Sequence, residues 1–100
     1  MKSVQSLLNY MKQHDLDAFF LAKKQNIRYI SGYTGDDSYL VITPNKFYFL
    51  TDPRYTEQAS LECPEYQIVL WKNYGSIGEC VAEIAKEQHI SSLAFEADTL

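Results

Sequence analysis

Two β-rich runs joined by a short turn constrain the fold of this chain more than any other feature. The first run is Tyr39–Ile42, the second is Phe47–Leu50, and the pair Pro44-Asn45 lies between them. Proline and asparagine are typical turn residues, and both runs are rich in apolar and aromatic side chains. The sequence therefore predicts a β-hairpin in the middle of the chain, and the fold must place its two strands side by side.

Helix-type and strand-type segments alternate on both sides of this hairpin. The apolar positions 4, 7, 8 and 11 form one helix stripe, with Ser3 as its expected N-cap. Another stripe runs through residues 77–85, behind an S-x-x-E capping box at residues 76–79. The other expected elements are a buried strand at Ala18–Leu21, a short helix at Lys24–Ser31 ending at Gly32, a helix that starts at Asp52-Pro53 and stops before Pro64, and strands at Tyr66–Leu70 and Leu93–Phe95.

These segments follow one another as α-β-α-β-β-α-β-α-β. Because helices alternate with strands except at the hairpin, we expect an α/β fold with a mixed β-sheet of about five to six strands flanked by helices on both faces. The first, fourth and fifth strands should run parallel to each other through right-handed crossovers. Residues 1–100 contain no linker-like segment, so one domain is expected. The last residues, Thr99-Leu100, would lead into another element, and we expect the chain to be a fragment of a longer polypeptide.

The composition argues against several classes of partner. The chain has 9 Lys and Arg against 13 Asp and Glu and no basic stripe, so we expect no nucleic-acid partner. No apolar run approaches the ~20 residues that cross a bilayer, and the polar N-terminus is not a signal peptide, so we expect no membrane partner. A secreted domain of this size would be richer in cysteine than Cys63 and Cys80 make it. Reduced thiols in a cytoplasmic protein are therefore expected, although a disulfide between the two stays open.

The loop before the hairpin is the strongest candidate for a functional surface. It reads Ser31-Gly32-Tyr33-Thr34-Gly35-Asp36-Asp37 and puts an aromatic side chain and two carboxylates on a tip that does not resemble core. The Asp pair could bind a metal or act as acid and base, but neighbours in an extended loop point apart, which favours a solvated turn. Arg54 opposes the dipole of the helix that Pro53 begins, so it should have a carboxylate or carbonyl partner.

The remaining residues offer no set able to do chemistry alone. His14 and His89 each follow a predicted helix, where a capping or surface role is expected, and neither has a second ligand at metal-binding spacing. No serine has a G-x-S-x-G context, and the glycines match neither G-x-G-x-x-G nor a P-loop. We therefore expect no catalytic residue and no metal ligand. The segment Trp71–Tyr74 could pack on a neighbouring domain or fold back on its own core.

The order and spacing of several motifs resemble one known family. The pattern N-x-x-Y-x-S-G-[aromatic]-T-G at residues 26–35 is followed by T-D-x-R-Y at residues 51–55, and Asp17–Leu21, Tyr39–Thr43 and Glu96 match as well. This combination resembles the N-terminal domain of Xaa-Pro peptidases and creatinases, the two-domain "pita-bread" metallohydrolases. The resemblance covers essentially the whole chain and looks closest to bacterial Xaa-Pro aminopeptidases or dipeptidases.

The resemblance implies a non-catalytic role for this chain in a metal-dependent hydrolase. In the family, a C-terminal catalytic domain holds two divalent ions, usually manganese or cobalt, which activate water for attack on the Xaa-Pro bond. This chain would bind no cofactor itself. The N-terminal domain supports oligomerisation and walls or gates the active site of a neighbouring subunit. The implied partners are its own C-terminal catalytic domain, a second subunit and a peptide substrate with proline.

The resemblance also divides the motif residues into two groups. The candidates for gating the substrate or facing a partner are Tyr33, Thr34, Gly35, Asp36 and Asp37. The motif residues expected to be structural are Ser31, Gly32, Asp52, Arg54 and Tyr55. A loop carboxylate could attract the free amino terminus of a substrate, whereas the short loop without arginine argues against creatine binding.

A second function class uses the same fold without catalysis. A stand-alone module that binds a peptide or a protein would share every feature above, and fold alone cannot separate it from a peptidase domain. The discriminating feature is whether a set of two Asp, one His and two Glu follows Leu100.

Overall fold

The structure of the chain is a computed structural model that describes residues 2–95. Its elements follow the predicted order, with two short 3₁₀ helices added. They are α1 (Lys2–Gln13), β1 (Ala18–Leu21), α2 (Lys24–Ser31), β2 (Tyr39–Ile42), β3 (Phe47–Thr51), η1 (Pro53–Tyr55), α3 (Thr56–Glu62), β4 (Gln67–Leu70), η2 (Trp71–Tyr74), α4 (Ile77–Glu87) and β5 (Leu93–Phe95). The predicted N-cap at Ser3 is wrong, since α1 already includes Lys2.

Five strands form one mixed sheet in the order β4-β3-β2-β1-β5. The predicted hairpin is present, because β2 and β3 are antiparallel with Tyr39 opposite Leu50. Strand β2 is also antiparallel to β1, whereas β1–β5 and β3–β4 are parallel pairs. The predicted α/β fold is confirmed. Strands β1, β4 and β5 do share one direction, but β4 pairs with β3, because α3 returns the chain to the open edge of that strand.

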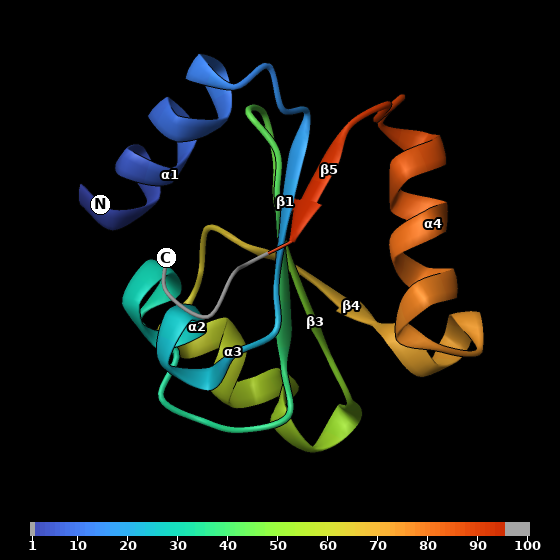
Figure 1. Cartoon of the computed structure of the whole chain (residues 1–100). Helices are drawn as coiled ribbons and strands as arrows, with labels where there is room; N and C mark the ends of the chain where they lie inside the picture. The colour runs from blue at the N-terminus through green and yellow to red at the C-terminus, as the bar shows by residue number, and fades with distance from the viewer. Residues whose placement is uncertain (1, 96–100) are drawn as a thin grey trace.

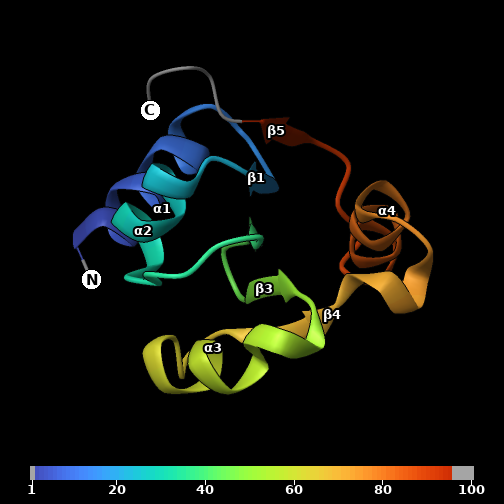
Figure 2. The ribbon, with the colours of Figure 1, turned by 90° about the horizontal axis from the view of Figure 1, so that it is seen from below.

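Helices cover the two faces of the sheet unequally. Figure 1 shows α1, α2 and α3 on one face and α4 alone on the other, and the view from below in Figure 2 shows the same division. Successive strand side chains point to opposite faces, so Phe19 and Leu21 join the core under α1–α3 while Ala18 joins the core under α4. Cys63 and Cys80 are buried in these two different cores and unpaired, as the sequence predicted.

Local sequence signals set the ends of α2 and α4. Gly32 ends α2 in the left-handed region at φ 83°, and its N–H donates to the Arg28 carbonyl at 2.8 Å. Ser76 caps α4, since its Oγ accepts from the Glu79 N–H at 3.1 Å. Both ends agree with the sequence prediction.

The start of α3 differs from the prediction in one respect. Asp52 is the expected N-cap, but it caps the 3₁₀ helix Pro53–Tyr55, and α3 begins only at Thr56. The Tyr55 N–H donates to the Asp52 carbonyl at 3.1 Å, which is the i→i+3 spacing of a tighter helix. Helix α3 ends at Glu62, before the proline, as predicted.

A carboxylate fastens the start of β1 to the segment that leads into β5. Asp17 accepts from the Ser91 N–H at 2.9 Å, from the Ser91 hydroxyl at 2.8 Å and from the Ser92 N–H at 3.2 Å. These bonds hold the pKa of Asp17 below its ordinary value, with the Ser91 N–H as the largest cause. The predicted family match at Glu96 lies outside the described residues.

The polar segments at the helix ends also have defined places. His14 and His89 are both exposed, and His89 has φ 55° where the chain leaves α4. Trp71 is half-buried and packs on the core under α4, so this side chain folds back on its own domain, while Tyr74 is exposed.

Within residues 2–95, no helix is long and apolar enough to cross a membrane.

Candidate functional site

The base of the candidate loop is fixed by Ser31 and Tyr33. The Ser31 hydroxyl donates to the Ile27 carbonyl at 2.6 Å and accepts from the Tyr33 N–H at 3.1 Å. The Tyr33 side chain is only 1% exposed, and its ring packs edge-on against Phe49 with centroids 4.6 Å apart. The prediction that this aromatic stands on the tip is wrong. Tyr33 turns back into the core and anchors the loop.

Gly35 lets the loop backbone pass directly over the end of the Tyr33 ring. A Cβ atom at position 35 would lie 2.6 Å from Tyr33 Cζ and would overlap its hydroxyl. The ring cannot easily yield, since Phe49 packs against it. The two glycines of the S-G-Y-T-G motif therefore have different roles. Gly32 adopts the left-handed backbone conformation that ends α2, and Gly35 allows the loop backbone to approach the Tyr33 ring closely.

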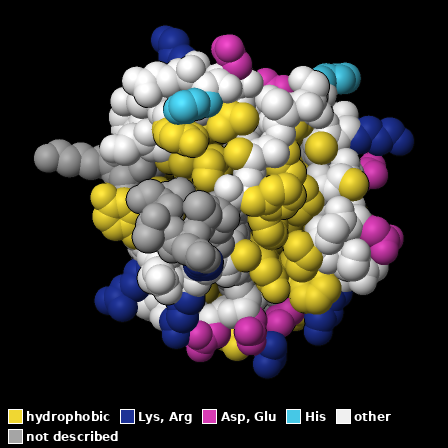
Figure 3. Space-filling view, in the orientation of Figure 1, with side chains coloured by type: hydrophobic (Ala, Val, Ile, Leu, Met, Phe, Trp, Pro, Cys, Tyr) yellow, Lys and Arg dark blue, Asp and Glu magenta, His cyan; other side chains and the backbone are white. Residues whose placement is uncertain are grey.

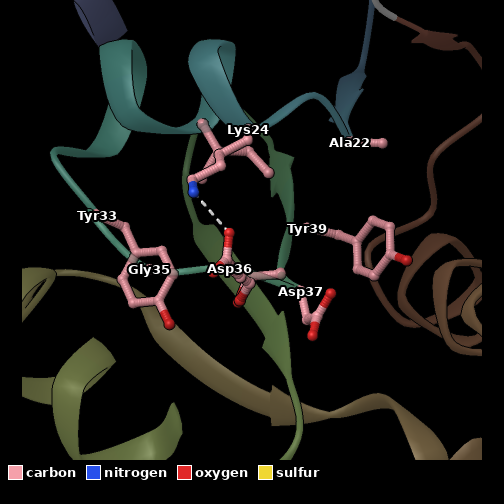
Figure 4. A pocket seen from close by; sticks show the side chains of 9 residues that line it. Ala22, Lys24, Tyr33, Gly35, Asp36, Asp37 and Tyr39 are labelled. Carbon is pink, nitrogen blue, oxygen red and sulfur yellow. Dashed lines mark hydrogen bonds and ion pairs between the residues drawn. The ribbon is translucent and has the colours of Figure 1, made fainter.

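The two loop carboxylates diverge toward different cations. Asp36 Oδ1 lies 2.6 Å from Lys24 Nζ, whereas Asp37 Oδ2 lies 3.6 Å from Arg54 Nη2. Figure 4 shows Asp36 turned up toward Lys24 and Asp37 turned away from it. The expectation that adjacent carboxylates point apart agrees with this geometry. The pair does not converge on a single point where one cation could be held.

Arg54 has the carboxylate partner that its position required. Its Nε and Nη2 contact Asp52 Oδ1 and Oδ2 at 3.1 and 2.8 Å, and this fork lowers the pKa of Asp52. The guanidinium also lies 5.0 Å from the centre of the half-buried Tyr55 ring. Asp52, Arg54 and Tyr55 thus form one connected unit beside the loop.

Two residues that sequence reasoning did not single out also hold the loop. They are Lys24, the first residue of α2, and Glu62, the last residue of α3. Glu62 accepts from the Thr34 N–H at 2.8 Å and from the Thr34 hydroxyl at 3.0 Å. No sequence signal identifies this contact, because 28 residues separate the partners and only the packing of α3 beside the loop brings them together.

The loop borders a hollow of about 240 Å³ at one end of the sheet. Its lining includes both loop carboxylates, Lys24, Ser38 and Tyr39. Among residues 2–95, no group of three or more His, Cys, Asp or Glu side chains could hold a metal ion. The hollow is lined by charged and aromatic side chains, among them Lys24, Asp36 and Tyr39.

A row of aromatic side chains leads from this hollow across the sheet face that α4 covers. Tyr39 of β2 stacks on Phe20 of β1 at 5.9 Å, and Phe20 meets Phe95 of β5 edge-on at 5.8 Å. Phe95 is 67% exposed. Figure 3 shows hydrophobic side chains gathered beside β5 and toward α4. These ring contacts connect Tyr39, which lines the hollow beside the charged loop, to the exposed Phe95.

Comparison with known proteins identifies the family. The model of the creatinase/prolidase N-terminal domain matches residues 4–100. The uncharacterized peptidase YqhT of Bacillus subtilis (strain 168) is 31% identical over 97 residues, which are 97% of this chain and 27% of that protein.

Solved structures give the same result. The Xaa-Pro dipeptidase from Bacillus anthracis is 34% identical with a TM-score of 0.86, and the match covers 100% of this chain and 28% of the dipeptidase. The N-terminal domain of the cytoplasmic peptidase PepQ from Mycobacterium tuberculosis H37Rv is 26% identical with a TM-score of 0.83, covering 95% of this chain and 72% of that domain. The resemblance inferred from the motifs is confirmed, and the chain belongs to the creatinase/prolidase N-terminal domain family.

Proposed function

We propose that this chain is the N-terminal, non-catalytic domain of a cytoplasmic Xaa-Pro peptidase, and that it walls or gates the active site of a neighbouring subunit. The family match and the similarity to the Bacillus anthracis dipeptidase support a peptidase parent. The chain spans about a quarter of the length of YqhT and of the dipeptidase, 27% and 28%. We assign the hydrolytic reaction to a C-terminal catalytic domain, as the family resemblance implies. The cytoplasmic assignment draws on the similarity to PepQ.

The observation that carries the proposal is the continuity of the loop with the aromatic row. Tyr39 belongs to both, because it lines the hollow beside Asp36 and Asp37 and also stacks on Phe20. A second subunit that covered the exposed Phe95 would therefore come to lie next to the loop. In that arrangement the two exposed carboxylates face the partner's active site, where they attract the free amino terminus of a peptide substrate.

The chemistry of the reaction is assigned to the catalytic domain. When bound there, two divalent ions such as manganese or cobalt supply an activated water for attack on the Xaa-Pro bond. The residues described here do not fit such a metal pair, because they contain no suitable cluster of ligands. The contribution of this chain is to orient the substrate and to exclude water from one side of the site.

Steady-state kinetics of the full polypeptide that carries this domain test the proposal. Replacing both loop carboxylates, Asp36→Asn with Asp37→Asn, should raise KM for Xaa-Pro peptides with a free amino terminus about tenfold while kcat changes little, since uniform binding is lost. Peptides with an acetylated amino terminus should show no such difference between the two enzymes. If the wild type and the double variant have equal KM values for every substrate, the gating role is refuted. If the full polypeptide does not hydrolyse Xaa-Pro peptides, the peptidase parent is refuted.

A further inference from the structure

The loop that carries Asp36 and Asp37 is attached to the core at its two ends. At the first end, Tyr33 is buried against Phe49. At the second, the Ser38 hydroxyl is buried 3.0 Å from the Thr51 hydroxyl. The residues between these ends are half-buried or exposed, so polar contacts with neighbouring side chains must set where the carboxylates stand.

Glu62 makes the most extensive of these polar contacts. One oxygen accepts from the Thr34 N–H at 2.8 Å, and both oxygens lie within 3.2 Å of the Thr34 hydroxyl. Gln58, one helical turn earlier on α3, donates to the same carboxylate at 3.2 Å and braces it. Hydrogen bonds to an ionised acceptor are the stronger kind, and the bond from Thr34 N–H is the largest cause that lowers the pKa of Glu62.

The position of Glu62 is not explained by helix stability. It is the last residue of α3, where the helix dipole disfavours a carboxylate. A neutral or basic residue would suit the helix end better. The acidic side chain at this position is instead explained by its hydrogen bonds to Thr34 on the loop.

Gln58 also donates to the Thr34 hydroxyl itself, at 3.3 Å. The two ion pairs that reach the loop hold it less firmly. Lys24 and Asp36 are each 62% exposed, and the Arg54–Asp37 contact is 3.6 Å long with both side chains 66% exposed. Exposed ion pairs of this kind contribute little and are screened by salt. The Ser38 hydroxyl also donates to the Asp36 carbonyl at 3.1 Å, close to the second end of the loop. Glu62 thus anchors the first half of the loop, through its hydrogen bonds to Thr34.

We propose that Glu62 is a positioning residue for substrate binding: by holding Thr34 it fixes where Asp36 and Asp37 stand against the substrate of the neighbouring subunit. This inference rests on the proposed gating function. Glu62 itself touches no reacting atom, and its effect reaches the substrate only through the loop.

Kinetics of Glu62 variants of the full enzyme test this role. Glu62→Ala should raise KM about threefold to tenfold with little change in kcat, the range that coupling between contacting residues produces. Glu62→Gln keeps an acceptor for the Thr34 N–H, so its KM should lie between those of the wild type and Glu62→Ala. Glu57→Ala removes an exposed carboxylate from the first turn of the same helix and should leave KM unchanged.

A double-mutant cycle separates positioning from general stability. In the Asp36→Asn, Asp37→Asn background, Glu62→Ala should add no further rise in KM, because nothing remains to be positioned. Two outcomes would overturn this inference and leave the proposed function standing. In the first, the KM increases of Glu62→Ala and of the loop variant multiply in the combined variant. In the second, the loop variant has a raised KM but Glu62→Ala keeps the wild-type KM. If the loop variant itself keeps the wild-type KM, the proposed function falls and this inference with it. Should Glu62→Ala fail to fold, Glu62→Gln carries the same cycle.

Discussion

At the scale of single residues, three glycines of this chain should respond differently to the same added methyl group. Gly35→Ala places a Cβ against the buried Tyr33 ring, and we expect a loss of about 1–3 kcal/mol in the free energy of unfolding. Gly32→Ala forces alanine to φ 83° and should cost about 1–2 kcal/mol.

The third glycine supplies the matched control. Gly78 lies inside α4, and a Cβ there would meet only Ser76 Oγ at 3.9 Å. Gly78→Ala should therefore raise the free energy of unfolding by about 0.5–1 kcal/mol. Urea denaturation of the three variants checks the signs. A stable Gly35→Ala protein would mean that the Tyr33 ring can move, contrary to the packing described above.

The sequence predicted the role of Gly32 at the end of α2, but it did not predict the burial of Tyr33. Gly32 was predictable because a helix stripe stops immediately before it, which is a local signal. Tyr33 was expected on the surface because glycines and aspartates surround it in the chain. Its burial depends on Phe49, which is 16 positions away and belongs to a different element. Contacts of that range are decided by the fold and leave no mark in the neighbouring sequence.

At the scale of elements, the sequence predicted the positions of the strands better than it predicted which strands pair in the sheet. The apolar runs of β1, β2, β3, β4 and β5 are all present, because alternation and β-rich composition are properties of the segment itself. The hairpin partner of β2 was equally clear, since a two-residue turn leaves no choice. The neighbour of β4 depends on where α3 and its flanking loops return the chain, which the sequence of β4 does not encode.

The attachment of β5 to β1 should depend on pH. The pKa of Asp17 is lowered in the folded chain, so its stabilisation is complete above the ordinary value of 3.8 and is lost as pH falls through the lower folded pKa. Asp17→Asn should lower the melting temperature at neutral pH. The gap between the two proteins should close below pH 3.8, which thermal unfolding over a pH series would reveal. A gap that persists at acid pH would assign the effect to packing.

At the scale of the whole molecule, we propose the aromatic row, on the sheet face that only α4 covers, as the surface that contacts a second copy. Phe95→Ser removes the most exposed member of that row without touching either buried core. In the full enzyme, we expect it to shift the oligomer toward the monomer, as measured by light scattering after size-exclusion chromatography. Leu61→Ser, an exposed apolar position on the opposite helical layer, is the control. Dissociation by Leu61→Ser alone would place the interface on α3 instead.

The candidate site could be predicted only in part, for a reason that also belongs to this scale. The motif order pointed to the loop and to the Asp52–Arg54 unit, because those residues are close in the chain. Lys24 and Glu62, which contact the loop, lie 12 and 28 residues away from their partners Asp36 and Thr34. They come from two different helices. Assembly of the site is therefore a property of the packed layers and not of any one segment.

The pairing of β1 with β5 also sets the order in which the chain can fold. Strands β1, β2 and β3 follow one another within 34 positions, whereas Asp17 meets Ser91 across 74. During synthesis, β1 therefore stays an open edge until the last described strand arrives, and an unpaired edge invites association with other chains. Asp17→Asn should accordingly speed unfolding in stopped-flow experiments while refolding keeps its rate, because contacts of such sequence separation form after the transition state. Slower refolding would instead put the closing of β5 into the folding nucleus.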